Sequence, residues 1–217
     1  MPKLTDDKHA KRAANILDSA EICFARSGFH RTTMQDICRQ AGVSAGALYV
    51  YFDSKEALIE GIVARDREEI ACLLQTLGEQ QDFFGAMEQA LMTCVVERPA
   101  HKVALFVEIV AEAHRNARVA QTLNGCDTLL RRMLTELVAR ARGEGRIPPG
   151  IPADQLAMVM AMLGDAMFIR RVMSPDFNGA AVAPLILDMM RQLMTGGAAP
   201  AALAPTLPDR NLTGAVQ

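Results

Sequence analysis

Residues 41–58 read A-G-V-S-A-G-A-L-Y-V-Y-F-D-S-K-E-A-L, and this stretch decides the fold. Its first three residues are too few for anything but a tight turn, in which Gly42 can take the left-handed backbone conformation that a sharp reversal between helices often needs. Ser44 follows as the cap of a short helix that we expect to end near Phe52. Leu48 and Phe52 stand four residues apart, which places both on the inward side of that helix. The stretch therefore predicts a short helix entered directly from a turn.

Two further helices are predicted upstream of this turn. Apolar residues recur every three or four positions from 8 to 27, and Gly28 then supplies a stop. Thr33 and Asp36 stand three residues apart, an arrangement typical of a capping box, and open a short helix through about Gln40. A helix, a three-residue turn and a second short helix form the plan of a helix-turn-helix, whose second helix lies in the major groove of DNA.

Downstream, the turn signals are sparser and the predicted helices are longer. We expect them at about 54–77, 81–98, 101–115, 117–142, 153–173 and 182–195, with a Gly- and Pro-rich loop at 143–152. From residue 196 onward no helical pattern is visible, which predicts a flexible tail. The sequence thus predicts an all-α fold with a three-helix helix-turn-helix DNA-binding domain (1–53), a larger helical ligand-binding and dimerisation domain (54–196) and a tail (197–217).

Composition agrees with a helical protein and excludes several other classes. Half of the 217 residues are hydrophobic, with 13 Met, no Trp and two Tyr, a bias away from strand formers. The five Cys are scattered without a CxxC pair, so neither disulfides nor a metal site is predicted, and no cofactor is expected. No signal peptide or long apolar run is visible, so we expect a cytoplasmic protein. The net charge is −2, but residues 1–55 carry eight Lys or Arg against six Asp or Glu, which fits a DNA-facing N-terminal part.

The outward residues of the third predicted helix favour DNA binding over a purely structural role. Ser44, Ala45, Gly46 and Ala47 are small, which lets the helix N-terminus and its free N–H groups approach bases and phosphates closely. Tyr49 and Tyr51 follow. Packing in the core or at its rim is the alternative for either tyrosine, but with Leu48 and Phe52 already facing inward at least one of them must face outward.

The whole stretch from Phe29 to Leu58 closely resembles the signature of the tetracycline-repressor-like (TetR) family of transcriptional regulators, with a core of A-G-V-S-x-G-x-L-Y-x-Y-F-x-S-K-E-x-L. The resemblance implies that the groove floor is met by Ser44, Ala45, Gly46 and Ala47, and that phosphates and the DNA backbone are bound by Thr33, Tyr49, Tyr51 and Lys55. The position of Tyr51 is often His in relatives, and Val50 stands where an aromatic or polar residue is common. The resemblance also implies a homodimer.

Sequence-specific contacts are expected to come mostly from outside this helix. Ala45 and Ala47 offer no hydrogen-bond donor to a base edge and can contact only thymine methyl groups. Discrimination is then expected from Gln35, from Arg31 or Arg39, or from the shape of the DNA. A solvated surface charge is an equally good interpretation of either arginine.

The helix expected at 153–173 is apolar nearly all round, so it must be covered on two sides. We assign one side to the protomer's own core and the other to a partner protomer, with the last helix completing a four-helix contact across a two-fold axis. The centre of a monomeric bundle is the alternative. The predicted interface residues are Met158, Ala161, Gly164, Ile169, Leu185, Ile186, Met189 and Leu193.

A small-molecule inducer, largely apolar, is expected inside the larger domain. Methionine suits an adaptable apolar pocket, although a Met stripe at helical spacing is more often core. The candidate pocket residues are Phe84, Met87, Phe106, Glu108, Val110, Met133, Leu137, Met162 and Phe168. Glu108, Asp165 or His114 could orient a ligand or bind a cation, or could be exposed or paired with Arg131 or Arg170.

The function predicted is that of a repressor released from a palindromic operator by a small-molecule inducer. A ligand-dependent activator shares every DNA-binding residue with it, so the sequence does not separate the two. A helical binding protein or enzyme without DNA binding is a further alternative. The chain shows no nucleophile and base pair, no metal motif and no Gly-rich phosphate loop, so no enzyme activity is predicted.

Overall fold

The computed structural model describes residues 3–174 and 176–195, with side chains from Lys8 onward. Every regular element in these two ranges is helical, so the prediction of an all-α fold is confirmed. In chain order the helices are α1 (Lys3–Ser27), α2 (Met34–Ala41), α3 (Ala45–Tyr49), α4 (Lys55–Gly78), α5 (Phe83–Leu91), the π-helix η1 (Met92–Val96), α6 (Ala100–Ala113), α7 (Ala117–Gly143), α8 (Ala153–Met173) and α9 (Gly179–Thr195). The predicted tail 197–217 lies outside the described residues.

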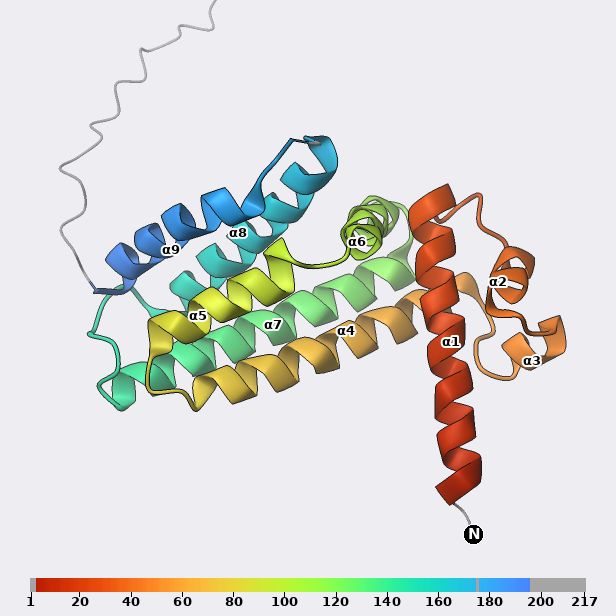
Figure 1. The fold of residues 1–217 in the computed structure, drawn as a ribbon, viewed down its shortest axis with the longest axis horizontal. Coiled ribbons are helices and arrows are strands. Elements are labelled where there is room, and N and C mark those ends of the chain that lie inside the picture. Colours follow the sequence, from red (N-terminus) through yellow and green to blue (C-terminus); the bar gives the residue numbers. More distant parts are fainter. Residues whose placement is uncertain (1–2, 175, 196–217) are drawn as a thin grey trace, which may run out of the picture.

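The helices form two groups that share one long element (Figure 1). At one end, α1 stands beside the short helices α2 and α3. At the other end, α5, α7, α8 and α9 build a bundle, and α4 runs into it from the side of the short helices. Helix α6 contacts both α1 and α7, so the two groups are joined by packed helices rather than by a linker.

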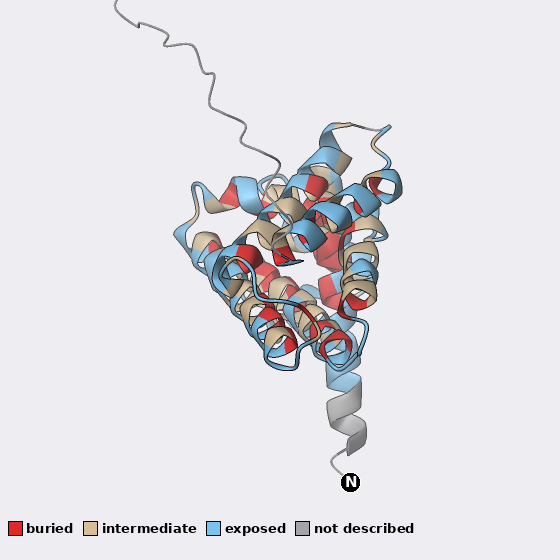
Figure 2. Ribbon diagram, turned by 90° about the vertical axis from the view of Figure 1, so that its left-hand side faces the viewer, coloured by how far each residue is buried: buried red, intermediate tan, exposed pale blue. Residues whose placement is uncertain are grey.

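The apolar side chains gather in two cores, which lie on the inward faces of the helices (Figure 2). The first core joins α1, α2, α3 and the start of α4, and it also takes in Leu105, Ile109 and Val119 from α6 and α7. The second core fills the bundle with residues such as Val138 and Leu156. Because the first core continues across residue 53, the helix-turn-helix is seated directly on α6 and α7.

Several element boundaries differ from those expected. Helix α1 begins at Lys3 rather than near residue 8. The helix predicted at 81–98 is divided into α5 and the π-helix η1, a wider turn that often occurs at functional sites. Helix α3 ends at Tyr49 rather than near Phe52. Helix α9 begins at Gly179, so that Pro184 lies inside it rather than in its first turn. Among the described helices, none has the length and apolar character that crossing a membrane would require.

Candidate nucleic-acid interface and ligand cavity

The N-terminus of α2 is held by a complete capping box. The Thr33 hydroxyl accepts from the Asp36 N–H at 3.1 Å, and the Asp36 carboxylate accepts from the Thr33 N–H at 3.0 Å. The hydrogen bonds from Thr33 hold the pKa of Asp36 below its usual value. Thr33 and Gln35 are both exposed, so the cap leaves them on the outer surface.

The turn between α2 and α3 has the predicted geometry. Gly42 lies in the left-handed region with a φ of 66°, and the Val43 N–H reaches back to the Cys38 carbonyl at 3.1 Å. The Ser44 hydroxyl then accepts from the Ala47 N–H at 3.2 Å and caps α3. Leu48 is fully buried and anchors α3 on the first core. The start of α3 therefore projects from the protein on a short, firmly seated helix.

The residues predicted to meet the groove floor lie together at this projecting end. Ser44, Ala45 and Gly46 are exposed and Ala47 is half-buried. A Cβ atom placed on Gly46 would meet nothing within 4 Å, so the surface there is open. The backbone of this segment is thus free to approach a duplex closely.

The two tyrosines have different environments. Tyr49 is 54% exposed and points away from the first core. Tyr51 is half-buried, packs against that core, and its ring lies 4.3 Å from the ring of His9 on α1. Tyr51 thus braces α1 against the segment after α3, while about half of the Tyr49 side chain lies at the surface.

The candidate cations on this side are already engaged within the protein. The Lys55 ammonium donates to the Phe29 carbonyl at 2.6 Å and lies over the Phe29 ring, 4.3 Å from its centroid. Arg31 donates to the Ser27 carbonyl at 2.9 Å, and Arg39 pairs with Asp36 at 3.2 Å. Lys55 therefore ties the start of α4 to the loop that leads into α2.

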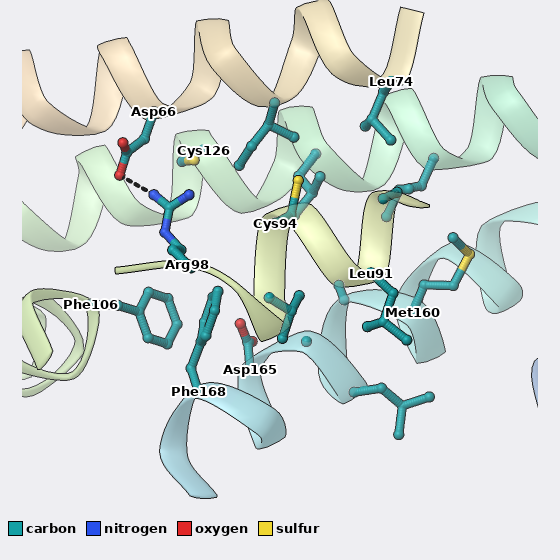
Figure 3. A pocket seen from close by; sticks show the side chains of 18 of the residues that line it. Asp66, Leu74, Leu91, Cys94, Arg98, Phe106, Cys126, Met160, Asp165 and Phe168 are labelled. Atoms are coloured by element: carbon teal, nitrogen blue, oxygen red, sulfur yellow. Dashed lines mark hydrogen bonds and ion pairs between the residues drawn. The ribbon is translucent and has the colours of Figure 1, made fainter. Parts of the chain in front are cut away.

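A second candidate site is an apolar cavity of about 250 Å³ enclosed by α4 to α9 (Figure 3). Of the predicted pocket residues, it is lined by Met87, Phe106 and Phe168. The other six lie elsewhere. Phe84, Met133 and Leu137 belong to or pack on the second core, and Val110 and Met162 are exposed. The Glu108 carboxylate accepts from the Phe29 N–H at 3.3 Å, outside the cavity.

One wall of the cavity is an ion-pair cluster that the sequence analysis missed. Asp66 on α4 binds Arg98 at 2.5 Å and Lys102 at 2.9 Å. Arg171 on α8 donates to the carbonyls of Val95 and Arg98, both at 2.7 Å, and so fixes the end of η1. In the sequence, Asp66 belongs to the charged run 65–69, which looks like a solvated helix face, and for that reason it gave no signal.

Two cysteines also line the cavity. Burial raises the pKa of both the Cys94 and the Cys126 thiols above the usual value. They are therefore neutral, weakly reactive thiols at neutral pH, and they act as apolar lining.

The cluster continues from the cavity to α1 and to the loop before α2. Lys102 also lies 4.0 Å from Glu21 of α1, a carboxylate that is almost fully buried. Arg65 of α4 pairs with this carboxylate and with Asp18, the latter at 2.7 Å. Farther along α6, Glu112 lies 3.0 Å from His30 in the loop before α2. Charged contacts thus join α4 and α6, which line the cavity, to the helices that carry the projecting surface.

Comparison with known proteins agrees with these features. A sequence model described as "Bacterial regulatory proteins, tetR family" matches residues 16–62. The HTH-type transcriptional regulator UidR of Escherichia coli is 32% identical over 153 residues, which make up 70% of this chain and 76% of UidR. This chain belongs to the TetR family. It is a helix-turn-helix transcriptional regulator by this relationship.

Two further relatives match this TetR-family regulator over nearly their whole length. The HTH-type transcriptional repressor Rv1474c of Mycobacterium tuberculosis is 24% identical over 196 residues, 88% of this chain and 100% of that protein. Salmonella enterica GusR has the same fold, with a TM-score of 0.73 and 29% identity over 86% of this chain and 94% of GusR. The similarity therefore covers both groups of helices.

The regulator exposes an apolar face on α8 and α9. Its exposed residues include Met158, Ile169, Leu185 and Met189 from the predicted interface. Met162, predicted for the pocket, lies on this face as well. Three residues predicted for the interface, Ala161, Gly164 and Ile186, instead line the cavity, and Leu193 packs on the second core. Helix α8 thus faces the cavity on one side and the surface on the other.

Proposed function

We propose that this TetR-family regulator is a repressor that binds a palindromic operator as a homodimer and is released by a small, largely apolar molecule held in the cavity. The observation that carries the proposal is that one helix serves both sites. Helix α4 begins at Lys55, which is bonded to the loop before α2, and its middle lines the cavity through Ile62, Asp66 and Ile70. A ligand that shifts α4 therefore acts directly on the DNA-binding end.

The DNA contacts proposed fall into two groups. Contacts to the groove floor come from Ser44, Ala45, Gly46 and Ala47, with Gln35 as the residue that reads a base edge. Phosphate contacts come from Thr33, Tyr49, Tyr51 and Lys55. Lys55 already makes two hydrogen bonds to backbone carbonyls, and an ammonium has three N–H donors, so one remains for a phosphate.

The homodimer is proposed to form through the apolar face of α8 and α9. Single exposed hydrophobic residues are normal, but several large apolar side chains exposed on neighbouring helices are typical of an interaction surface. Because a two-fold contact places the same face of each protomer together, the pair presents two α3 helices for two half-sites about 34 Å apart.

The proposal is tested first on DNA. Genomic fragments protected by the full-length protein are recovered by footprinting, and binding to one of them is measured by fluorescence anisotropy across a salt series. We expect preference for that fragment over bulk DNA, with affinity that falls steeply as salt rises. Equal binding to all fragments at every salt concentration would overturn the assignment of a specific operator, and no binding to any fragment would overturn the DNA-binding assignment.

The direction of regulation is tested in cells. Loss of the gene is expected to raise transcription of the genes beside the protected fragment, as for a repressor. A fall in the same transcripts would instead identify an activator. The purified protein and its footprint are the same in both cases, so this measurement decides only the sign of regulation.

A further inference from the structure

One charged group at the cavity has no partner among the described residues. Four charged side chains line the cavity, namely Asp66, Arg98, Lys102 and Asp165. Arg98 and Lys102 both bind the Asp66 carboxylate in the cluster on the α4 side. Within residues 3–174 and 176–195, Asp165 makes neither an ion pair nor a hydrogen bond. The cavity therefore has one carboxylate whose charge nothing in the described chain neutralises.

Asp165 lines the cavity and also reaches the surface of the single chain. It projects from α8 toward the cavity beside Phe168, which lies three residues further along the same helix (Figure 3). The residue as a whole is exposed in the single chain, yet partial burial of the carboxyl raises its pKa, and the nearby negative charge of Asp127 raises it further. Its neighbours on the outer face of α8, Met162 and Ile169, are apolar.

Two aromatic rings lie beside this carboxylate. The rings of Phe106 on α6 and Phe168 on α8 have centroids 5.1 Å apart and planes inclined by 57°. Both line the cavity, with Asp165 next to Phe168 (Figure 3). A cation is attracted to the face of an aromatic ring as well as to a carboxylate, and both attractions are stronger away from water.

From this arrangement we propose that the cavity binds a lipophilic organic cation, an amine or quaternary ammonium with an aryl or alkyl body. Its charge lies against Asp165 and the rings of Phe106 and Phe168, and its apolar body lies against the remaining lining. The proposal rests on the proposed function only in taking this cavity as the ligand site of the regulator.

The opposite charge fits the cavity less well. An anion would seek Arg98 or Lys102, but both are already bound to Asp66, and Lys102 also lies 3.6 Å from Glu69. Such a ligand would have to break these pairs and would face the charge of Asp165. A neutral ligand would displace water from the cavity and leave the Asp165 carboxylate without a partner there.

The test compares three probes with the same body and different charge: 4-phenylbutylamine, 4-phenylbutanol and 4-phenylbutyrate. Their dissociation constants are measured by titration calorimetry on the full-length protein at pH 7.5. We expect the amine to bind at least about tenfold more tightly than the alcohol, as for a charge-assisted contact, and the carboxylate to bind most weakly. Asp165→Asn keeps the shape of the side chain and is expected to abolish the difference between amine and alcohol.

Asp154→Asn is the matched control, because Asp154 is an exposed aspartate on the same helix that does not line the cavity, and it should keep the amine preference. Equal binding of the three probes, tighter binding of the carboxylate, no binding of any probe, or an unchanged preference in Asp165→Asn would each overturn the proposal. Operator binding is measured on the same samples. A wild-type protein that binds DNA but shows no preference for the amine refutes the ligand class alone, whereas absence of DNA binding by the wild type refutes the proposed function.

Discussion

Replacing Leu185 with glutamate on the apolar face of α8 and α9 should separate the proposed dimer. Leu185 is 69% exposed in the single chain, and fully burying a leucine side chain contributes about 1.5–3 kcal/mol. Covering the exposed part would then contribute about 1–2 kcal/mol per protomer, and about 2–4 kcal/mol for the two copies of a symmetric pair. The loss of this contribution alone, before the cost of burying the new carboxylate is added, should raise the dissociation constant of the dimer roughly thirty- to several-hundredfold.

Sedimentation velocity over a range of protein concentrations measures this shift directly. Val50→Glu is the matched control, because Val50 is 73% exposed and lies beside α3, far along the chain from the proposed interface. It should leave self-association unchanged. Circular dichroism checks that both variants keep their helix content, since a surface substitution should leave the protomer folded.

A folded Leu185→Glu variant that remains a dimer at the same concentrations as the wild type would refute the assignment of this face. The reasoning would also fail if Val50→Glu dissociated the dimer equally, because the effect would then come from added charge in general. Where the assignment holds, Leu185→Glu should also weaken operator binding, because a lone protomer reaches only one half-site.

Three further changes test other parts of the account. Tyr49→Phe removes an exposed hydroxyl and should weaken binding to all operator variants alike, by about 0.5–1.5 kcal/mol in anisotropy titrations, with an unchanged melting temperature; an effect confined to some operator sequences would contradict a phosphate contact. Glu21→Gln removes the buried negative charge that pairs with Arg65, and it should lower the free energy of unfolding in urea by about 1–3 kcal/mol. Asp18→Asn removes the exposed partner of the same arginine and should change this free energy by less than about 1 kcal/mol. Asp165→Asn should raise the melting temperature at neutral pH, because the fold raises the pKa of Asp165 and so disfavours its charged form. The gain in melting temperature should shrink as the pH falls through that raised pKa and Asp165 in the wild type becomes protonated. A gain that grows at low pH would contradict the direction of the pKa shift.

The geometry of the proposed DNA-binding surface could be predicted from the sequence because its determinants are local. The cap at Thr33, the left-handed Gly42 and the cap at Ser44 each act within four residues, and the observed hydrogen bonds are those that such spacings favour. Lys55 shows the limit of local reasoning, because its two carbonyl acceptors lie some 25 residues earlier in the chain.

The cavity was predicted less well because its lining depends on long-range packing. A periodic apolar pattern shows which face of a helix is inward but not whether a neighbour fills the space in front of it, so Met133 and Leu137 could not be told apart from Met87. The cluster around Asp66 brings together residues more than 30 positions apart. In sequence these residues look like ordinary solvated charges.

Helix α4 explains how the proposed release can work although the cavity and the DNA-binding surface do not touch. The stretch of α4 from Lys55 to Leu74 spans about 28 Å at the usual rise of 1.5 Å per residue. A ligand that tilts this stretch by roughly 5° about its cavity end displaces the Lys55 end by about 2.5 Å. Hydrogen bonds to phosphates and bases are lost over a few tenths of an ångström to 1 Å, so a small tilt in each protomer takes both α3 helices out of register with their half-sites.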